Sequence, residues 1–329
     1  MITPGIFRRS LRRALRWRVL LLWWAALAVS GAIAVAPVFA FLRGQLDRST
    51  AARDAVAWMD GPTLLELVRQ VRESGAEQGI LVALAVALAT QLLWAPFVAA
   101  AMVASAHGDE SLPFSRLLAS AGELYGRMLR TAVAGLIPLG AGAAVAAGAL
   151  KLAAAHAADR AITETDAGRA LIVAGCAAAL VIFIAALVVD AARAQFAADP
   201  VRRSALAALW TGSKMVWRLP LRAAGIGAVG MVLGVGGALV LMAIRLQIPQ
   251  RGVPTLALAW LLAQGAQLAV GFGRAIRIEG LAELSRADAA EASRRASRRL
   301  PPGGTTQGTE VVHSTTLSAL EPPRSGAPR

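Results

Sequence analysis

The chain has 329 residues, of which 57% are hydrophobic and 16% charged, with a formal net charge of +14 and a mean hydropathy of +0.57. Ordinary soluble domains are about 45 to 50% apolar and about 25% charged, so this composition excludes an ordinary soluble domain and indicates a membrane protein. The one cysteine, Cys176, excludes an intrachain disulfide.

Six long apolar runs, almost free of charge, follow one another along the chain. A membrane-spanning helix needs about 20 such residues to cross roughly 30 Å of hydrocarbon. These runs predict an all-α polytopic fold with six transmembrane helices arranged as three hairpins. They cover residues 19–42, 79–106, 131–152, 170–189, 223–244 and 254–272.

The first run follows an arginine-rich leader, as a signal peptide would. It is longer than the usual apolar stretch of a signal peptide and ends at Phe41-Leu42-Arg43 without a small-x-small cleavage site, so we expect a retained helix. The leader itself, FRRSLRRALRWR, has a short apolar face. After the first span, TLLELVRQVRES predicts a short amphipathic helix over 63–74.

Two amphipathic segments, which begin 92 residues apart, share one pattern of apolar offsets. Phe114 starts the pattern in SLPFSRLLASAGELYGRMLR, and Leu206 starts it in DPVRRSALAALWTGSKMVWRLPLR. Asp199-Pro200 is a start signal for the second helix. Together with the leader, these segments predict three units, each an interfacial amphipathic helix followed by a transmembrane hairpin.

Charged and amide side chains within spans are candidate functional residues. Asp190 ends the fourth span three residues before Arg193, so the two can pair on one helical face as an anchor or form part of a substrate or proton site. Gln91 in the second span, and Gln264 and Gln267 in the sixth, either bond neighbouring helices or line a polar path.

The fifth span contains Gly-x-Gly-x-x-Gly at 225–230. This motif has the glycine spacing of a dinucleotide-binding loop but lacks the sequence context of one. That fingerprint requires a preceding strand and an acidic residue about 20 positions later, and neither is present. The glycines instead form one helical stripe, which predicts close packing with another helix of this chain or of a second subunit. The stripe is Gly227, Gly230, Gly234 and Gly237.

Residues 285–329 are rich in Arg, Ser, Thr, Gly and Pro. This composition predicts a disordered cytoplasmic tail after a transmembrane domain over 1–284.

Six spans place both termini on one side of the membrane. That side carries 24 of the 34 basic residues, so the positive-inside rule predicts that both termini are cytoplasmic. The charge then indicates anionic lipid headgroups as partners rather than nucleic acid.

The sequence offers no catalytic, cofactor or metal site. The three histidines fall in different regions, and no nucleophile elbow, phosphate loop or zinc-protease motif occurs. We therefore expect a non-enzymatic protein of the bacterial inner membrane that organises lipids, a membrane protein partner or further copies of itself. The alternative is a transporter or permease-like protein for a small or lipidic substrate.

The region from about residue 6 to 283 resembles uncharacterised bacterial six-helix membrane proteins, with VVDAARAQFAADPVRRSALAALWTGSKMVWRLP as its most telling stretch. In these proteins a D-x-A-R end of the fourth span precedes a basic amphipathic helix. The layout also resembles the membrane domain attached to some glycerophosphodiester phosphodiesterases. No phosphodiesterase domain is present in this sequence, so the resemblance implies a membrane fold and no activity.

Overall fold

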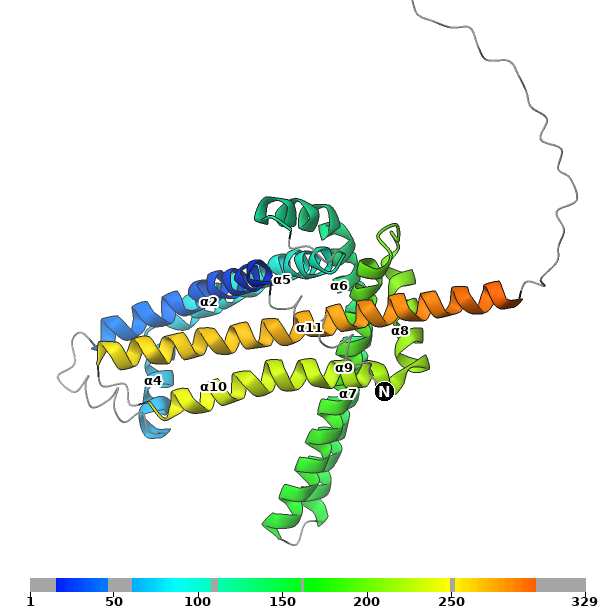
Figure 1. The fold of residues 1–329 in the computed structure, drawn as a ribbon. Helices are drawn as coiled ribbons and strands as arrows, with labels where there is room; N and C mark the ends of the chain where they lie inside the picture. Colours follow the sequence, from blue (N-terminus) through cyan, green and yellow to red (C-terminus); the bar gives the residue numbers. More distant parts are fainter. Residues whose placement is uncertain (1–15, 47–60, 108–111, 161–162, 249–251, 300–329) are drawn as a thin grey trace, which may run out of the picture. The chain divides into compact units, whose positions relative to one another are not determined.

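The computed structural model describes residues 16–46, 61–107, 112–160, 163–248 and 252–299 (Figure 1). The chain divides into two units, Met1–Asp288 and Ala289–Arg329, and the contacts between helices that are described below lie within the first. The described ranges are helical and contain no strand, which confirms the all-α prediction. The helices are α2 (Trp17–Leu46), α4 (Gly61–Glu73), α5 (Ala76–Ser105), α6 (Phe114–Arg160), α7 (Glu164–Ala198), α8 (Ala205–Arg218), α9 (Pro220–Met231), the π-helical turn η1 (Val232–Gly236), α10 (Gly237–Leu246) and α11 (Val253–Arg299).

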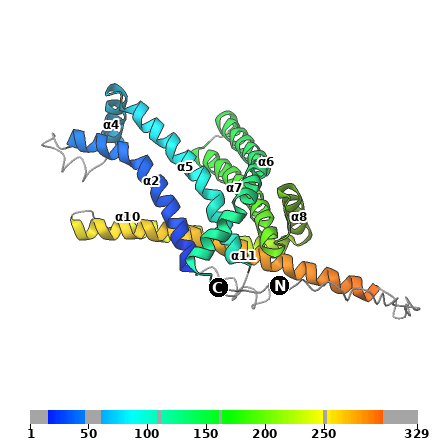
Figure 2. The ribbon, with the colours of Figure 1, turned by 90° about the horizontal axis from the view of Figure 1, so that it is seen from above.

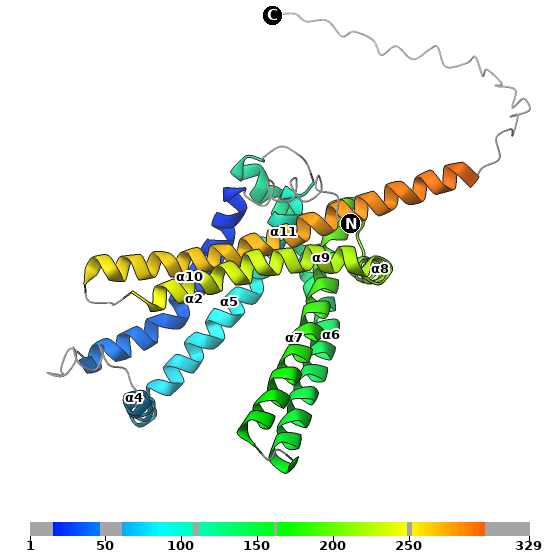
Figure 3. The same cartoon turned by 60° about the horizontal axis from the view of Figure 1, so that its bottom comes forward.

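All six predicted spans are present as helices long and apolar enough to cross a membrane. The first four are α2, α5, α6 and α7, the fifth is the continuous run α9–η1–α10, and the sixth is α11. Figures 2 and 3 show α2 beside α5 and α6 beside α7, and Figure 3 shows α10 beside α11. The structure is therefore that of a multi-pass membrane protein built from helical hairpins.

The amphipathic segment before the third span is not a separate helix. Helix α6 runs without a break through both parts, and it also continues through Pro138. The apolar face of the segment, including Leu117, Ala121 and Met128, is buried against the protein. This segment therefore packs on other helices. Most of the comparable leader segment lies outside the described residues.

The helix after the fourth span begins later than predicted. Asp199 closes the C-terminal end of α7, and its carboxylate accepts a hydrogen bond from the Val201 amide. Ser204 is the N-cap of α8, since its hydroxyl accepts a hydrogen bond from the Ala207 amide. The Asp-Pro pair is therefore part of a turn that separates α7 from α8.

The predicted disorder from residue 285 onward is wrong for residues 285–299, which continue α11 as a helix. This stretch is rich in alanine and arginine, both good helix formers. Arg295 also pairs with Glu291 one turn earlier, in the favourable order of acid before base. Residues 300–329, the rest of the predicted tail, lie outside the described residues.

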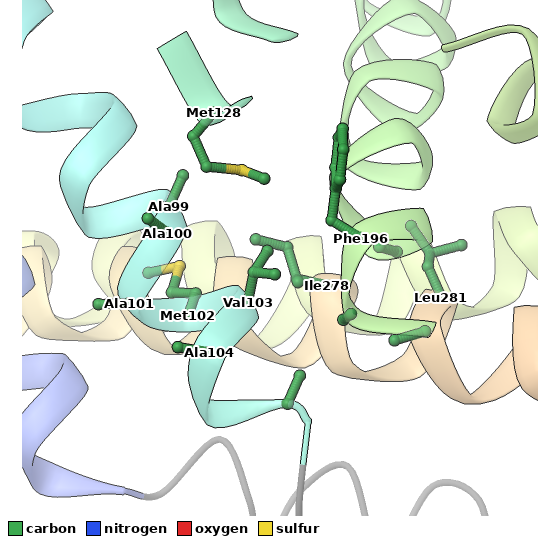
Figure 4. Close-up of a cluster of buried hydrophobic side chains, with 14 of the residues drawn as sticks. Ala99, Ala100, Ala101, Met102, Val103, Ala104, Met128, Phe196, Ile278 and Leu281 are labelled. Carbon is green, nitrogen blue, oxygen red and sulfur yellow. The ribbon is translucent and has the colours of Figure 1, made fainter. Parts of the chain in front are cut away.

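The buried core lies toward one end of the spans, which we call the α8 end. There α2 begins, α5 and α7 end, and α9 begins. Figure 4 shows part of this core, where Val103 of α5, Met128 of α6, Phe196 of α7 and Ile278 of α11 meet. Along most of the remaining span length, large apolar side chains are exposed, as expected for surfaces that face lipid.

Candidate functional site

A cavity of about 270 Å³ lies among the spans near the α8 end, and we call it the arginine cavity. Side chains from the fourth and sixth spans supply its charges, and apolar residues and two glycines of the fifth span supply much of its wall. It is lined by Trp23, Leu139, Ala186, Val189, Asp190, Arg193, Gly230, Met231, Gly234, Val235, Val270, Arg274 and Arg277. Of these, sequence reasoning singled out Asp190, Arg193 and the two glycines.

Asp190 is the anion at the centre of the arginine cavity, and its side chain is only 3% exposed. Nη1 of Arg193 lies 2.9 Å from one carboxylate oxygen, on the same helical face of α7. Nη2 of Arg277, from α11, lies 3.2 Å from the other oxygen. Asp190 therefore joins α7 to α11, which the spacing of Asp190 and Arg193 alone does not reveal.

Arg274 is the third arginine of the cavity and lies one turn before Arg277 on α11. Its guanidinium carbon is 5.5 Å from the ring centre of Trp23, in the range of a cation–π contact. Within the described residues, no carboxylate lies within ion-pair distance of Arg274. The cavity lining thus carries three guanidinium groups and one carboxylate, so positive charge is in excess.

The glycine stripe of the fifth span allows this span to approach neighbouring helices closely beside the arginine cavity. A Cβ atom at Gly230 would lie 2.6 Å from the carbonyl oxygen of Gly273, and one at Gly234 would lie 3.0 Å from the Gly273 Cα. Gly237 faces Ala269, also on α11, whereas Gly227 faces Phe183 of α7. The packing partners of the stripe are therefore helices of this same chain, and the close approach brings Arg277 beside the fifth span.

The amide side chains of the second and sixth spans lie against α2. Trp24 Nε1 donates to Gln264 Oε1 at 2.6 Å, and the Ser30 hydroxyl donates to Gln91 Oε1 at 3.0 Å. Gln267 accepts a hydrogen bond from Trp23 through its backbone carbonyl at 2.9 Å, while its side-chain oxygen is buried without a partner. These contacts tie α2 to α5 and to α11.

A second cavity, of about 730 Å³, is an open groove between α6 and the start of α8, and we call it the α6–α8 groove. Its walls are apolar and mostly exposed side chains, and two arginines lie along it. The lining residues are Leu129, Arg130, Val133, Ala134, Ile137, Arg203, Ser204, Ala205 and Leu206. Within the described ranges, Arg130 and Arg203 make no ion pair or hydrogen bond, so both are available to a ligand.

Helix α8 is held firmly against α7 by a face of small residues. Its buried side includes Ala205, Ala208 and Gly212, and a Cβ atom at Gly212 would lie 2.7 Å from the Ala192 backbone nitrogen. The opposite side exposes Trp210 at 63% and Trp217 at 75%. Sequence reasoning identified the aromatic face and missed the small-residue face that makes the contact.

The turn between α7 and α8 is also fixed to α6. Nη1 of Arg127 donates to the carbonyl oxygens of Pro200 and Arg202, at 2.9 and 3.3 Å. Arg202 in turn donates to the Thr211 hydroxyl at 2.8 Å. The two walls of the α6–α8 groove therefore hold a fixed spacing.

Comparison of the chain with protein-family models, with curated proteins and with solved structures found no match. The resemblance to six-helix membrane proteins and to the phosphodiesterase membrane domain stays a prediction. Among the residues that the structure describes, no three His, Cys, Asp or Glu side chains gather as a metal site would require.

Proposed function

We propose that this chain is a non-enzymatic integral protein of the bacterial inner membrane that gathers acidic phospholipids at the cytoplasmic ends of its spans. The observation that carries the proposal is the α6–α8 groove. It combines apolar walls around a volume of about 730 Å³ with two arginines that have no partner within the described chain.

The arrangement of the groove matches the two parts of a phospholipid. Val133 and Ile137 continue along α6 into its apolar run and are 60% and 69% exposed, as suits contact with an acyl chain. Arg130 and Arg203 lie nearer the α8 end, where a headgroup phosphate would meet them. Basic side chains at a membrane surface attract anionic lipids by about 1 kcal/mol each.

Helix α8 supports the same proposal. Its exposed side carries Leu206 and two tryptophans, and Lys214 Nζ lies 4.9 Å from the ring centre of Trp210. Tryptophan favours the headgroup region of a bilayer, where an aromatic ring and a cation are both stable. A helix of this kind, fixed against α7, would hold lipids in a defined position beside the spans.

The charge distribution of the sequence favours a cytoplasmic location for the α8 end, with both termini on that side. A transporter with a path through Gln91, Gln264 and Gln267 has less support. The side-chain oxygens of Gln91 and Gln264 accept hydrogen bonds from α2, as packing residues would.

The proposal is tested by extracting the full chain from cells with its surrounding lipids and measuring lipid classes by mass spectrometry. We expect phosphatidylglycerol and cardiolipin to be enriched over the bulk membrane. The double variant Arg130→Met and Arg203→Met should reduce that enrichment. Arg222→Met, which changes an exposed arginine of α9 outside the groove, is the matched control. Equal enrichment in all three proteins would contradict the proposal.

A further inference from the structure

The arginine cavity holds more positive charge than the described chain neutralises. Oδ1 of Asp190 accepts a hydrogen bond from Arg193, and Oδ2 forms an ion pair with Arg277 but accepts no hydrogen bond within the described residues. Arg274 lies over the ring face of Trp23 and forms no ion pair within the described residues. An arginine stays protonated in proteins, so the cavity carries two uncompensated charges next to a membrane interior.

Hydrogen-bonding capacity is in excess as well. The Nε groups of Arg193 and Arg277 are buried, and neither finds an acceptor within the described residues. Buried polar groups in native proteins are normally hydrogen-bonded, so unpaired donors around a cavity call for a partner. These donors and the Arg274 guanidinium come from two helices that Asp190 holds together.

The donors define the chemistry of that partner. Guanidinium groups present parallel N–H donors that match the oxygens of phosphate or carboxylate, and phosphate offers more acceptor oxygens and charge to a cluster of arginines. The cavity volume of about 270 Å³ is roughly nine times the ~30 Å³ share of one water molecule in the liquid. It therefore accommodates a phosphate group together with a small substituent.

The walls indicate how the partner enters. Met231, Val235 and Val270 line the cavity and are 41%, 42% and 37% exposed, and all three belong to spanning helices. The cavity thus has an apolar side in the part of the chain that faces lipid. A headgroup attached to acyl chains can enter there and place its phosphate among the arginines.

The π-helical turn η1 lies at this same wall. It contains Gly234 and Val235, both of which line the cavity. Single π-turns within helices occur often at functional sites, because the extra residue widens the backbone locally. The fifth span is therefore irregular at the point where the cavity meets the lipid-facing side.

We propose that the arginine cavity binds a phosphate group, carried by the headgroup of an acidic phospholipid, between Arg193, Arg274 and Arg277. This site is distinct from the α6–α8 groove and does not depend on it. Asp190 fixes two of the arginines in place, and Arg274 supplies a guanidinium that has no carboxylate partner within the described residues.

The test uses the full chain in nanodiscs of phosphatidylcholine with and without phosphatidylglycerol, and native mass spectrometry reads the lipids retained after partial delipidation. We expect the wild type to retain phosphatidylglycerol in preference to phosphatidylcholine. Arg274→Met should weaken that retention about tenfold or more, since a hydrogen bond to a charged group is lost. Arg222→Met should retain the lipid as the wild type does.

If Arg274→Met does not accumulate in cells, two further variants of Arg274 replace it in the measurement. Arg274→Gln retains a polar side chain without the charge, and Arg274→Lys retains the charge without the planar fork. Both should fold and bind less tightly than the wild type, the lysine variant less severely. Wild-type retention in every Arg274 variant would overturn the inference and leave the arginines as a structural ion cluster.

A second arm separates the sources of the phosphate. Inorganic phosphate is added to the detergent-solubilised chain, and the melting temperature is measured for the wild type and Arg274→Met. If inorganic phosphate stabilises only the wild type, and the wild type does not retain phosphatidylglycerol, the phosphate that binds in the cavity does not come from a lipid.

The double variant Arg130→Met and Arg203→Met serves as a reference. If it retains the tightly bound lipid that Arg274→Met loses, the cavity site stands even where the groove proposal fails.

Discussion

The arginine cavity and the amide contacts of α2 are two polar regions inside the same set of spanning helices, and they differ in how completely their groups are paired. Two amide oxygens accept hydrogen bonds from α2, at 2.6 and 3.0 Å, whereas the Gln267 side-chain oxygen is buried without a partner. In the cavity, by contrast, Arg193 and Arg277 share one carboxylate, and Arg274 has none within ion-pair distance among the described residues. Paired groups explain helix packing, whereas unpaired donors in a cavity indicate a ligand.

The largest expected effect follows from removing the one anion of the cavity. Asp190→Asn leaves Arg193 and Arg277 without their carboxylate, and breaking a buried ion pair costs about 3 to 5 kcal/mol. We expect a clear drop in melting temperature in phosphatidylcholine nanodiscs, and a smaller drop when phosphatidylglycerol is present. An equal drop in both lipids would show that no headgroup reaches the cavity.

A smaller effect is expected from adding a methyl group at the close contact between the fifth span and α11, beside the arginine cavity. Gly230→Ala places a methyl group 2.6 Å from the Gly273 carbonyl, and overpacking of this kind costs about 1 to 3 kcal/mol. Gly236→Ala, in the same span, meets only Val232 at 4.0 Å and should leave stability unchanged or slightly higher. Thermal unfolding of the two variants checks this, and equal stability would argue against close packing on α11.

The smallest effect belongs to the amide region. Gln264→Leu removes the hydrogen bond from Trp24 and should lower stability by about 0.6 to 2 kcal/mol, the range for such bonds in membranes. Lipid retention should stay at the wild-type level, because Gln264 does not line the arginine cavity. A loss of phosphatidylglycerol retention without a loss of stability would reverse the roles that we assign to the two regions.

The sequence predicted the six spans because each apolar run has a length that only a membrane helix needs. It also predicted that Asp190 and Arg193 can pair, since residues three apart on a helix share a face. Both predictions depend on local periodicity, which one sequence contains in full.

The remaining arginines of the cavity depend on contacts between distant helices. Arg277 reaches Asp190 from 87 positions along the chain, and no repeat or motif marks that pair. Arg274 and Arg277 follow the apolar run of the sixth span, so they read as ordinary basic residues at a membrane edge. Their one-turn spacing on a helix that also carries Gly273 was the signal available, because a small residue there allows close approach.

The most direct test of the cavity is a solid-state NMR measurement of 15N–31P dipolar coupling on the chain with 15N-labelled arginine in phosphatidylglycerol membranes. The account predicts guanidinium signals that couple to lipid phosphorus in the wild type and are lost in Arg274→Met, while the signals of exposed arginines stay the same in both proteins. Identical coupling in the two proteins would contradict a phosphate site in the arginine cavity.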